Sequence, residues 1–214
     1  MTIPQRLKKL NTSALHDVLR EKNYQNFVLP NDITGLNNKD KIAGEVFTVE
    51  GVVTNTFSAH ETLLQWTRLL SRAPPEKVLV CQPNSASLAL MGELSAETLK
   101  NKGVLGYVVD GGCRDCEMIS RLEFPVFCKF KTPADIVGAW IPRKLGGKIQ
   151  IGNVDIKNGD YIVGDSDGVI RIPRKIIDEV VTGAEKIISS ENKVRKAILS
   201  GIDPEEAYIK FGKF

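Results

Sequence analysis

The hydrophobic pattern of residues 91–130 predicts a helix, a buried strand, a short helix and a second strand. Residues 95–102 are rich in helix formers, and Gly103 follows them where a helix C-terminus is expected. Residues 105–109 form a short apolar run with β-forming side chains. The glycine-containing stretch 110–112 is expected to end that strand in a turn.

The lengths of this helix and strand imply that the start of the helix and the end of the strand lie at the same edge of the sheet. A helix of about ten residues rises roughly 15 Å, and a strand of about five residues covers roughly 16 Å. If the two pack antiparallel, the helix start at residues 92–95 lies at the same sheet edge as Arg114 and Asp115. Open α/β sheets usually bind ligands at this edge, beyond the carboxyl ends of the strands. We therefore predict the active site there.

The chain before residue 91 alternates between helical and strand patterns. The stretch Asn11-Thr12-Ser13 offers an N-cap for a first amphipathic helix. Ser58 and Glu61 form a capping box at the start of another helix. The expected elements after the first helix are a loop over residues 23–41, a strand over 42–49, a helix over 58–71 and a strand over 77–81.

The chain after residue 130 changes to short β segments and ends in helices. The expected strands cover residues 136–140, 148–151, 154–156, 161–163 and 169–172. Asn158-Gly159 is a strong hairpin signal. Pro173 suits the first position of a long helix that reaches about residue 199, and Asp203 caps a last short helix. We expect a single α/β domain over residues 1–214, without repeats or linkers.

Composition and charge narrow the class of protein. The 214 residues are 42% hydrophobic and 26% charged, which is ordinary for a soluble globular domain. A net charge of +3 is too small and too evenly spread to indicate nucleic-acid binding. No apolar run reaches the length of a membrane span, and the first residues do not resemble a secretion signal. A cytoplasmic protein without nucleic-acid or membrane partners is expected.

The four cysteines and one histidine offer weaker candidates. Cys81 and Cys128 lie in apolar runs and are expected to be buried free thiols. Cys113 and Cys116 form a C-x-x-C pair, but neither a second ligand pair nor a thioredoxin-like setting accompanies it. We therefore expect no redox or zinc role. His60 could act as a catalytic base, or it could simply belong to the first turn of its helix.

The predicted sheet edge carries residues suited to binding an anion and a metal ion. Free N–H groups at the helix start bind carboxylates or phosphates, and Gly92 lets a ligand approach the backbone. Arg114 can grip a carboxylate with its guanidinium fork. Asp115 and Glu93 offer hard oxygen ligands for Mg²⁺ or Mn²⁺. Alternatively, Glu93 merely favours a helix N-terminus, while Arg114 and Asp115 form a surface pair.

The segment GEL-x-A-x(6)-G-x(2)-G-x-VVDG-x(2)-RD, which ends at Asp115, resembles the 4-hydroxy-4-methyl-2-oxoglutarate aldolase family. That family also contains the regulator of ribonuclease activity A. Its aldolases share an acidic residue, twenty intervening residues and then Arg-Asp, which here are Glu93 and the pair Arg114-Asp115. Many members have Asp at the first position, so Glu93 departs from the pattern while keeping a carboxylate. The resemblance implies a swivelling β/β/α-type fold and a homotrimer or homohexamer.

The resemblance also implies a lyase activity and the residues that perform it. The expected function is a divalent-metal-dependent class II aldolase or decarboxylase that converts 4-hydroxy-2-oxo acids or oxaloacetate to pyruvate. The substrate would contact Gly92, Glu93, Leu94, Ser95 and Arg114. The enolate formed by bond cleavage needs stabilisation of its negative charge.

The expected cofactor is Mg²⁺ or Mn²⁺. The resemblance implies that Asp115 binds the metal directly, that Glu93 binds it through water, and that a C-terminal carboxylate of a neighbouring subunit helps to hold metal-bound water. Glu191 is our candidate for that carboxylate.

Three other functions compete with this interpretation. Another branch of the family regulates a ribonuclease or an RNA helicase by binding protein, and such a regulator does not need Glu93, Arg114 and Asp115. A Schiff-base mechanism needs a lysine, and none lies within residues 92–95 or 114–115. Methyl transfer has little support because no glycine-rich nucleotide loop is present.

Overall fold

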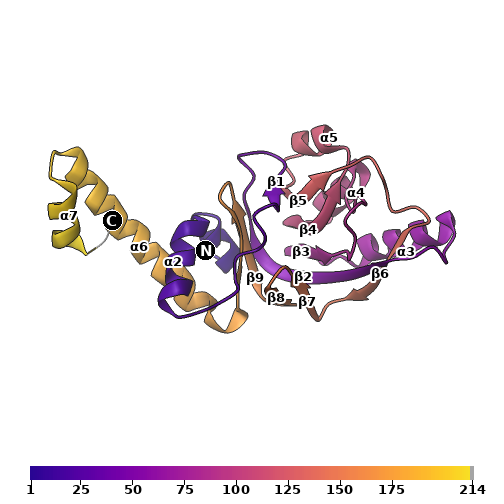
Figure 1. Ribbon diagram of the computed structural model, residues 1–214, viewed down its shortest axis with the longest axis horizontal. Helices are drawn as coiled ribbons and strands as arrows, with labels where there is room; N and C mark the ends of the chain where they lie inside the picture. Colours follow the sequence, from indigo (N-terminus) through magenta and orange to yellow (C-terminus); the bar gives the residue numbers. More distant parts are fainter. Residues whose placement is uncertain (213–214) are drawn as a thin grey trace.

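The structure, a computed structural model, describes residues 1–212 and has a mixed α/β fold (Figure 1). The main sheet is built from β1 (Thr34–Gly35), β2 (Ile42–Val53), β3 (Lys77–Gln82), β4 (Gly106–Cys113), β5 (Val126–Lys131), β6 (Trp140–Leu145), β9 (Tyr161–Asp165) and β10 (Gly168–Ile172). Within the described residues its order is β1-β5-β4-β3-β2-β9-β10, with β6 paired to β2. The last two residues of the expected domain, 213–214, lie outside the described residues.

Four parallel strands, β2 to β5, form the part of the sheet that carries the predicted site. They are connected by the helices α3 (Ala59–Arg72), α4 (Glu93–Asn101) and α5 (Cys116–Arg121). Because the strands run in one direction, their carboxyl ends meet at one edge. The remaining pairings, including those of β1, β6, β9 and β10, are antiparallel, and a bridge between Val28 and Ile170 helps to make the sheet nearly closed and barrel-like. The expected α/β class is therefore confirmed.

Alternating side chains of the central strands pack into two separate parts of the core. Along β3, Val78 and Val80 face the inside of the curved sheet, whereas Leu79 and Cys81 face the layer of α3, α4 and α5. This period of two follows from the pleat of a strand. Both faces are buried, which explains why β3 is apolar at nearly every position. The antiparallel hairpin of β7 (Lys148–Ile151) and β8 (Val154–Lys157) closes the inner side.

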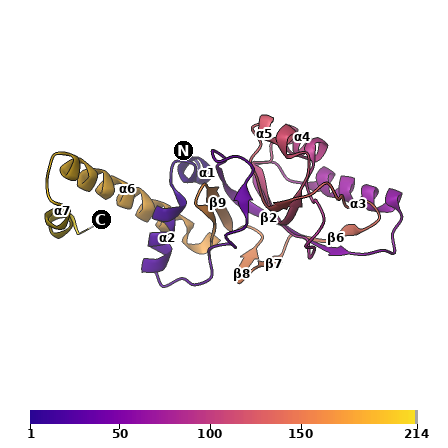
Figure 2. The same ribbon diagram turned by 45° about the horizontal axis from the view of Figure 1, so that its top comes forward.

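Helices from the two ends of the chain form a third packed layer. They are α1 (Ile3–Leu7), α2 (Thr12–Glu21), the 3₁₀ helix η1 (Arg174–Ile176), α6 (Ile177–Leu199) and α7 (Pro204–Phe211). The first half of α6 packs on α2 through an apolar face that includes Val180, Val181 and Ala184. Beyond α2, α6 leads away from the sheet and α7 folds back beside it (Figures 1 and 2). The predicted long helix is confirmed, although Pro173 precedes η1 rather than starting α6.

In the described part of the chain, no helix combines the length and apolar character that a membrane crossing requires.

The prediction that residues 110–112 end the strand in a turn is wrong, because β4 continues through them to Cys113. The strand register shifts between Val109 and Gly112, which indicates a bulge. Beyond the bulge, the Gly112 N–H donates to the Leu88 carbonyl (3.1 Å), and the Leu90 N–H donates to the Gly112 carbonyl (2.8 Å). A Cβ at position 112 would lie 2.7 Å from the Leu88 oxygen, so only glycine permits this approach.

The strand predicted over residues 136–140 is also misplaced. The N–H groups of Ala139 and Trp140 both donate to the Ile136 carbonyl, which forms a turn before β6 begins at Trp140. Gly138 adopts a left-handed conformation in this turn (φ 69°). The apolar character of this stretch comes from Ile136 and Trp140, whose side chains are buried in the core from a turn and a strand end respectively.

Asn158-Gly159 forms a turn but not the predicted hairpin. β8 before it pairs with β7, whereas β9 after it pairs with β2 and β10. The Asn158 N–H donates to the Gly147 carbonyl and the Gly159 N–H donates to the Val46 carbonyl. The turn therefore connects two sheets, because long-range partners decide the pairing. A turn at residues 166–167 connects β9 to β10.

Candidate functional site

The start of α4 and the end of β4 meet at one sheet edge, as the sequence predicted. The Arg114 N–H donates to the Met91 carbonyl (2.9 Å), which fixes the two backbone segments side by side. The Glu93 N–H at the first turn of α4 donates to Asp115 Oδ2 (3.1 Å). Gly92, the N-cap residue of α4, has no side chain with which to accept that bond. Asp115 therefore caps a helix that is distant from it in sequence.

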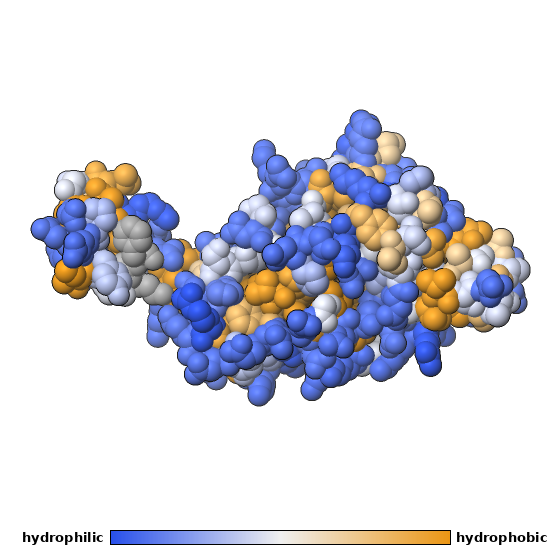
Figure 3. All heavy atoms as spheres, viewed as in Figure 1, coloured by the Kyte–Doolittle hydropathy of each residue, from blue (hydrophilic) through white to orange (hydrophobic). Residues whose placement is uncertain are grey.

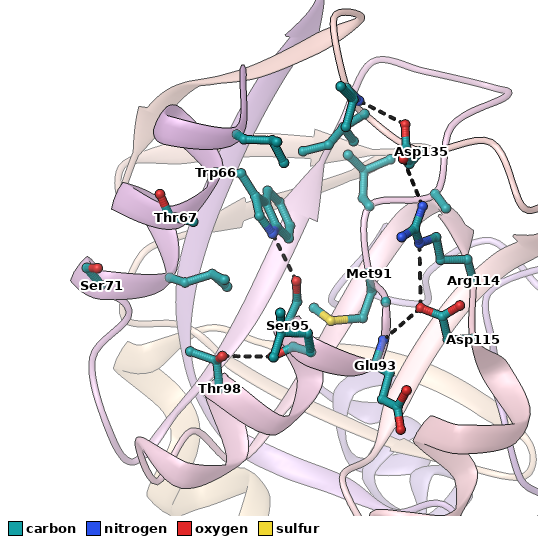
Figure 4. A pocket seen from close by; sticks show the side chains of 18 of the residues that line it. Trp66, Thr67, Ser71, Met91, Glu93, Ser95, Thr98, Arg114, Asp115 and Asp135 are labelled. Atoms are coloured by element: carbon teal, nitrogen blue, oxygen red, sulfur yellow. Dashed lines mark hydrogen bonds and ion pairs between the residues drawn. The ribbon is translucent and has the colours of Figure 1, made fainter. Parts of the chain in front are cut away.

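Asp115 adopts an unusual backbone conformation to do this. Its φ of 53° and ψ of 32° lie in the left-handed region, which only a few per cent of non-glycine residues occupy. It is the N-cap residue of α5, yet its side chain makes no cap bond to α5 and reaches α4 instead. Strained residues of this kind cluster at functional sites. The conformation turns the carboxylate toward the start of α4, as Figure 4 shows.

Gly92 makes room for the pair Arg114-Asp115. A Cβ at position 92 would lie 2.8 Å from Asp115 Oδ2 and 3.2 Å from Arg114 Nε. The backbone of Gly92 is extended (φ −138°), a conformation that any residue adopts. The need for glycine therefore comes from space rather than from backbone freedom.

The variant Gly92→Ala is expected to fold normally and to lose catalytic rate by about tenfold or more. The added methyl group pushes Asp115 and Arg114 apart, and a displacement of about 1 Å can cost about a hundredfold in rate. The steady-state rate of the pyruvate release that the family resemblance implies, compared with the thermal unfolding midpoint, checks this. Wild-type activity in Gly92→Ala would show that the arrangement of Arg114 and Asp115 does not control the reaction.

Arg114 lies between two carboxylates. Its Nη1 donates to Asp135 Oδ2 (2.9 Å), and its Nε lies 3.5 Å from Asp115 Oδ2 (Figure 4). Asp135 is fixed in turn because its Oδ1 accepts the Val137 N–H (3.0 Å). The Arg114 side chain is 40% exposed, so these pairs add only about 0–1 kcal/mol to stability. Their effect is to orient the guanidinium, whose Nη2 makes no bond to other described residues.

A cavity of about 600 Å³ opens at this edge. Six of the seven residues predicted from the sequence to form the site line it, namely Gly92, Glu93, Leu94, Ser95, Arg114 and Asp115, whereas Glu191 does not. The sequence analysis missed Trp66 on α3, Asp135 after β5 and Lys102 after α4. Asp135 follows β5, the neighbour of β4, and this position at the carboxyl end of a strand was the one local signal available. Nothing local points to Trp66, which the packing of α3 against α4 brings to the cavity.

The helix start offers fewer free N–H groups than expected. The Glu93 N–H is already bonded to Asp115, and the Ala96 N–H donates to the Gly92 carbonyl (3.0 Å). The N–H groups of Leu94 and Ser95 have no partner among the described residues and lie at the positive end of the α4 dipole. These two amides and Arg114 line the same cavity and offer donors suited to an anion.

Two further candidates lie elsewhere in the structure. His60 is exposed in the first turn of α3, where the predicted capping box between Ser58 and Glu61 is present, and it does not line the cavity. Glu191 lies on α6, which leads away from the sheet (Figure 1). A role for Glu191 requires a neighbouring subunit and stays a prediction.

All four cysteines are free thiols. Burial raises the pKa of the Cys81 thiol to about 12. A hydrogen bond with Cys128 and burial raise the pKa of Cys113, and burial raises the pKa of Cys116. Protonated thiols are poor metal ligands and poor nucleophiles. The absence of a zinc or redox role for the C-x-x-C pair stays a prediction.

The carboxylates at the edge fit a cation that keeps water molecules. Asp115 Oδ1 and the Glu93 carboxylate have no hydrogen-bond partner within residues 1–212. Over the same residues, no group of three or more His, Cys, Asp or Glu side chains converges closely enough to hold a metal ion by itself. A cation bound by Asp115 would therefore complete its coordination with water and ligand oxygens, which is typical of Mg²⁺.

Comparison with known proteins places the fold and the motif in one family. Residues 12–171 match the sequence model of the RraA-like family, described as Aldolase/RraA. A Halalkalibacterium halodurans protein, provisionally named 4-hydroxy-4-methyl-2-oxoglutarate aldolase, is 28% identical over 182 residues, which cover 85% of this chain and 83% of the relative.

Two solved structures share the fold. Streptomyces coelicolor RraAS2, described as an unusual member of the RNase ES inhibitor RraA protein family, has a TM-score of 0.80 and 25% identity, covering 91% of this chain and 96% of that chain. An uncharacterized Pseudomonas syringae protein has a TM-score of 0.87 and 22% identity, covering 98% of this chain and 93% of that chain. With the family match over residues 12–171, these likenesses lead to one conclusion: this chain belongs to the RraA-like family.

Proposed function

We propose that the protein is a divalent-metal-dependent lyase that releases pyruvate from 4-hydroxy-2-oxo acids or from oxaloacetate. The observation that carries the proposal is the position of Asp115. One of its carboxylate oxygens is held by the Glu93 N–H, the other has no partner among the described residues, and Arg114 lies beside it in the cavity. The provisional aldolase names of relatives support the same reaction class.

The site residues have separate roles in this reaction. Asp115 would hold the cation directly, and Glu93 would orient water bound to it. When bound, Mg²⁺ or Mn²⁺ supplies a Lewis acid that stabilises developing negative charge on the 2-oxo group. Arg114 and the amides of Leu94 and Ser95 bind the substrate carboxylate and keep the oxo group oriented.

The reaction then consists of cleavage of the C3–C4 bond and protonation of the resulting enolate. A water molecule oriented by Glu93 would take the 4-hydroxyl proton, and the C3–C4 bond then breaks to leave a carbonyl product and the enolate of pyruvate. Arg114 stabilises the enolate charge, and a proton from water at C3 gives pyruvate. Oxaloacetate that loses carbon dioxide passes through the same enolate, so one site serves both reactions.

Pyruvate release is expected to stop when divalent metal is removed and to return when Mg²⁺ or Mn²⁺ is added. We expect this loss because the removal of metal abolishes the charge stabilisation that cleavage requires. A lactate dehydrogenase coupled assay over a panel of 4-hydroxy-2-oxo acids and oxaloacetate measures the pyruvate released. Lactate dehydrogenase needs no divalent metal, so the chelator acts on this protein alone and can stay in place during the assay.

Two results would contradict the proposal. The first is undiminished pyruvate release after exhaustive chelation. The second is a borohydride-trapped substrate adduct on Lys102, the lysine that lines the cavity, because an imine would replace the metal in stabilising the enolate. Lys102 Nζ donates to the Ser71 carbonyl (2.9 Å), which is the position of a structural lysine. We therefore expect no adduct.

A further inference from the structure

The cavity has two chemically different halves. The half around the end of β4 carries the charged side chains of Glu93, Arg114, Asp115 and Asp135. The other half is formed by α3, the outer side of α4 and the turn before β6. Its walls are made of carbon, from Leu63, Trp66, Leu70, Leu94, Ile136 and Val137. Figure 3 shows hydrophobic surface over α3, at the right of the molecule.

Three polar side chains of the apolar half are already bonded within the protein, whereas the Ser71 hydroxyl has no partner among the described residues. Trp66 Nε1 donates to Ser95 Oγ (2.9 Å), as Figure 4 shows. The hydroxyl of Thr67 donates to the Leu64 carbonyl (3.1 Å), and the hydroxyl of Thr98 donates to the Leu94 carbonyl (2.7 Å). A ligand that reaches this half therefore meets mostly aromatic and aliphatic surface, with the Ser71 hydroxyl as the unbonded polar side chain.

Trp66 gives this surface a fixed shape. The residue is only 7% exposed, and its ring packs edge-to-face against Trp140, with ring centroids 5.9 Å apart. The bond to Ser95 fixes the other side of the indole. A wall that is packed and hydrogen-bonded on two sides cannot move aside for a hydrated group, and it favours an apolar one.

The charges of the cavity do not suit a second carboxylate in the ligand. Its lining contains three carboxylates and two cations, which leaves a net charge of one negative before any metal binds. Arg114 lies between Asp115 and Asp135 in the polar half, where it suits one carboxylate. Lys102 is the cation of the other half, and its ammonium already donates to the Ser71 carbonyl. A second carboxylate there would lose water without gaining a fork of donors.

We propose that the cavity selects monoanionic 2-oxo acids whose distal end is aliphatic or aromatic, in preference to dicarboxylic acids. The 2-oxo acid end lies against Arg114 and the start of α4, and the distal end lies against Trp66 and Leu63. This inference rests on the proposed function for the orientation of the substrate. It adds the substrate class, with Leu63 and Trp66 as the residues that determine it.

Binding of non-cleavable 2-oxo acids tests the preference without requiring turnover. Isothermal titration in the presence of Mg²⁺ compares 4-methyl-2-oxopentanoate with 2-oxoglutarate, which have the same five-carbon main chain. We expect 4-methyl-2-oxopentanoate to bind at least about tenfold more tightly, the effect of one or two buried methyl groups. Equal binding, tighter binding of 2-oxoglutarate, or no binding of either acid would overturn the proposal.

Two neighbouring leucines of α3 provide a matched pair of variants. Leu63 lines the cavity and is 44% exposed, whereas Leu64 does not line it and is 39% exposed. Leu63→Lys is expected to reduce the preference at least about tenfold, because it places a cation against the apolar wall. Leu64→Lys is expected to leave it unchanged. Equal effects of both variants would contradict a subsite at Leu63.

A third variant tests the competing role of Lys102. If Lys102→Met selectively abolishes 2-oxoglutarate binding, Lys102 binds a second carboxylate and the proposal is wrong. We expect Lys102→Met to leave the preference unchanged. The pyruvate assay tests the proposed function separately. If the protein cleaves a diacid in preference to apolar substrates, the lyase reaction is supported but the proposed substrate class is wrong.

Discussion

Replacing Asp115 with asparagine is expected to lower pyruvate release about a hundredfold or more and to weaken activation by Mg²⁺ at the same time. Asparagine tolerates the left-handed backbone at this position. Its amide oxygen can still accept the Glu93 N–H, so the start of α4 stays capped. What the substitution removes is the negative charge that attracts the cation. The measurement is kcat/KM across a Mg²⁺ titration.

The matched control is Asp155→Asn. Asp155 lies on β8, its side chain is 52% exposed, and it pairs with Lys148, so its neutralisation changes the net charge equally without touching the cavity. Asp155→Asn is expected to behave as wild type. If folded Asp115→Asn also releases pyruvate at the wild-type rate, the metal site lies elsewhere.

Replacing Arg114 with lysine is expected to reduce turnover about a hundredfold while the Mg²⁺ concentration for half activation stays nearly unchanged. Lysine keeps the charge but has no planar fork. It cannot bond Asp135 and a substrate carboxylate together with the geometry that Arg114 uses. The loss of one oriented donor to developing charge costs about 10²–10³ in rate. Steady-state kinetics at several Mg²⁺ concentrations separate the two quantities.

Arg121→Lys is the corresponding control. Arg121 is 67% exposed on α5, where it pairs with Glu117 one helical turn away. Its replacement should change neither turnover nor metal activation. Equal turnover of Arg114→Lys and Arg121→Lys would show that Arg114 does not contact the reacting substrate.

Local signals were sufficient for the part of the site formed by α4 and β4. Gly92 and Gly103 mark where the helix begins and ends, and the apolar run at 105–109 marks the strand. Because these elements are adjacent in sequence, their antiparallel packing returns the chain to the edge where the helix begins, although β4 continues to Cys113 and is longer than expected. The bond between the Glu93 N–H and Asp115 shows that the two ends do meet.

The rest of the site depends on contacts between distant segments. Asp135 reaches Arg114 from the turn after β5, and Trp66 reaches Ser95 from α3. Neither side chain differs locally from an ordinary turn aspartate or a core tryptophan. The same reason explains the errors at residues 110–112 and at Asn158-Gly159, where pairing with remote strands overrides turn-forming residues.

The measurement that tests the central claim most directly is a crystal structure of the protein with Mn²⁺ and oxalate, a planar mimic of the pyruvate enolate. The account predicts an anomalous manganese peak about 2.0–2.3 Å from a carboxylate oxygen of Asp115, with oxalate between the metal and Arg114. Manganese bound away from Asp115, or oxalate bound outside the cavity at the start of α4, would contradict it.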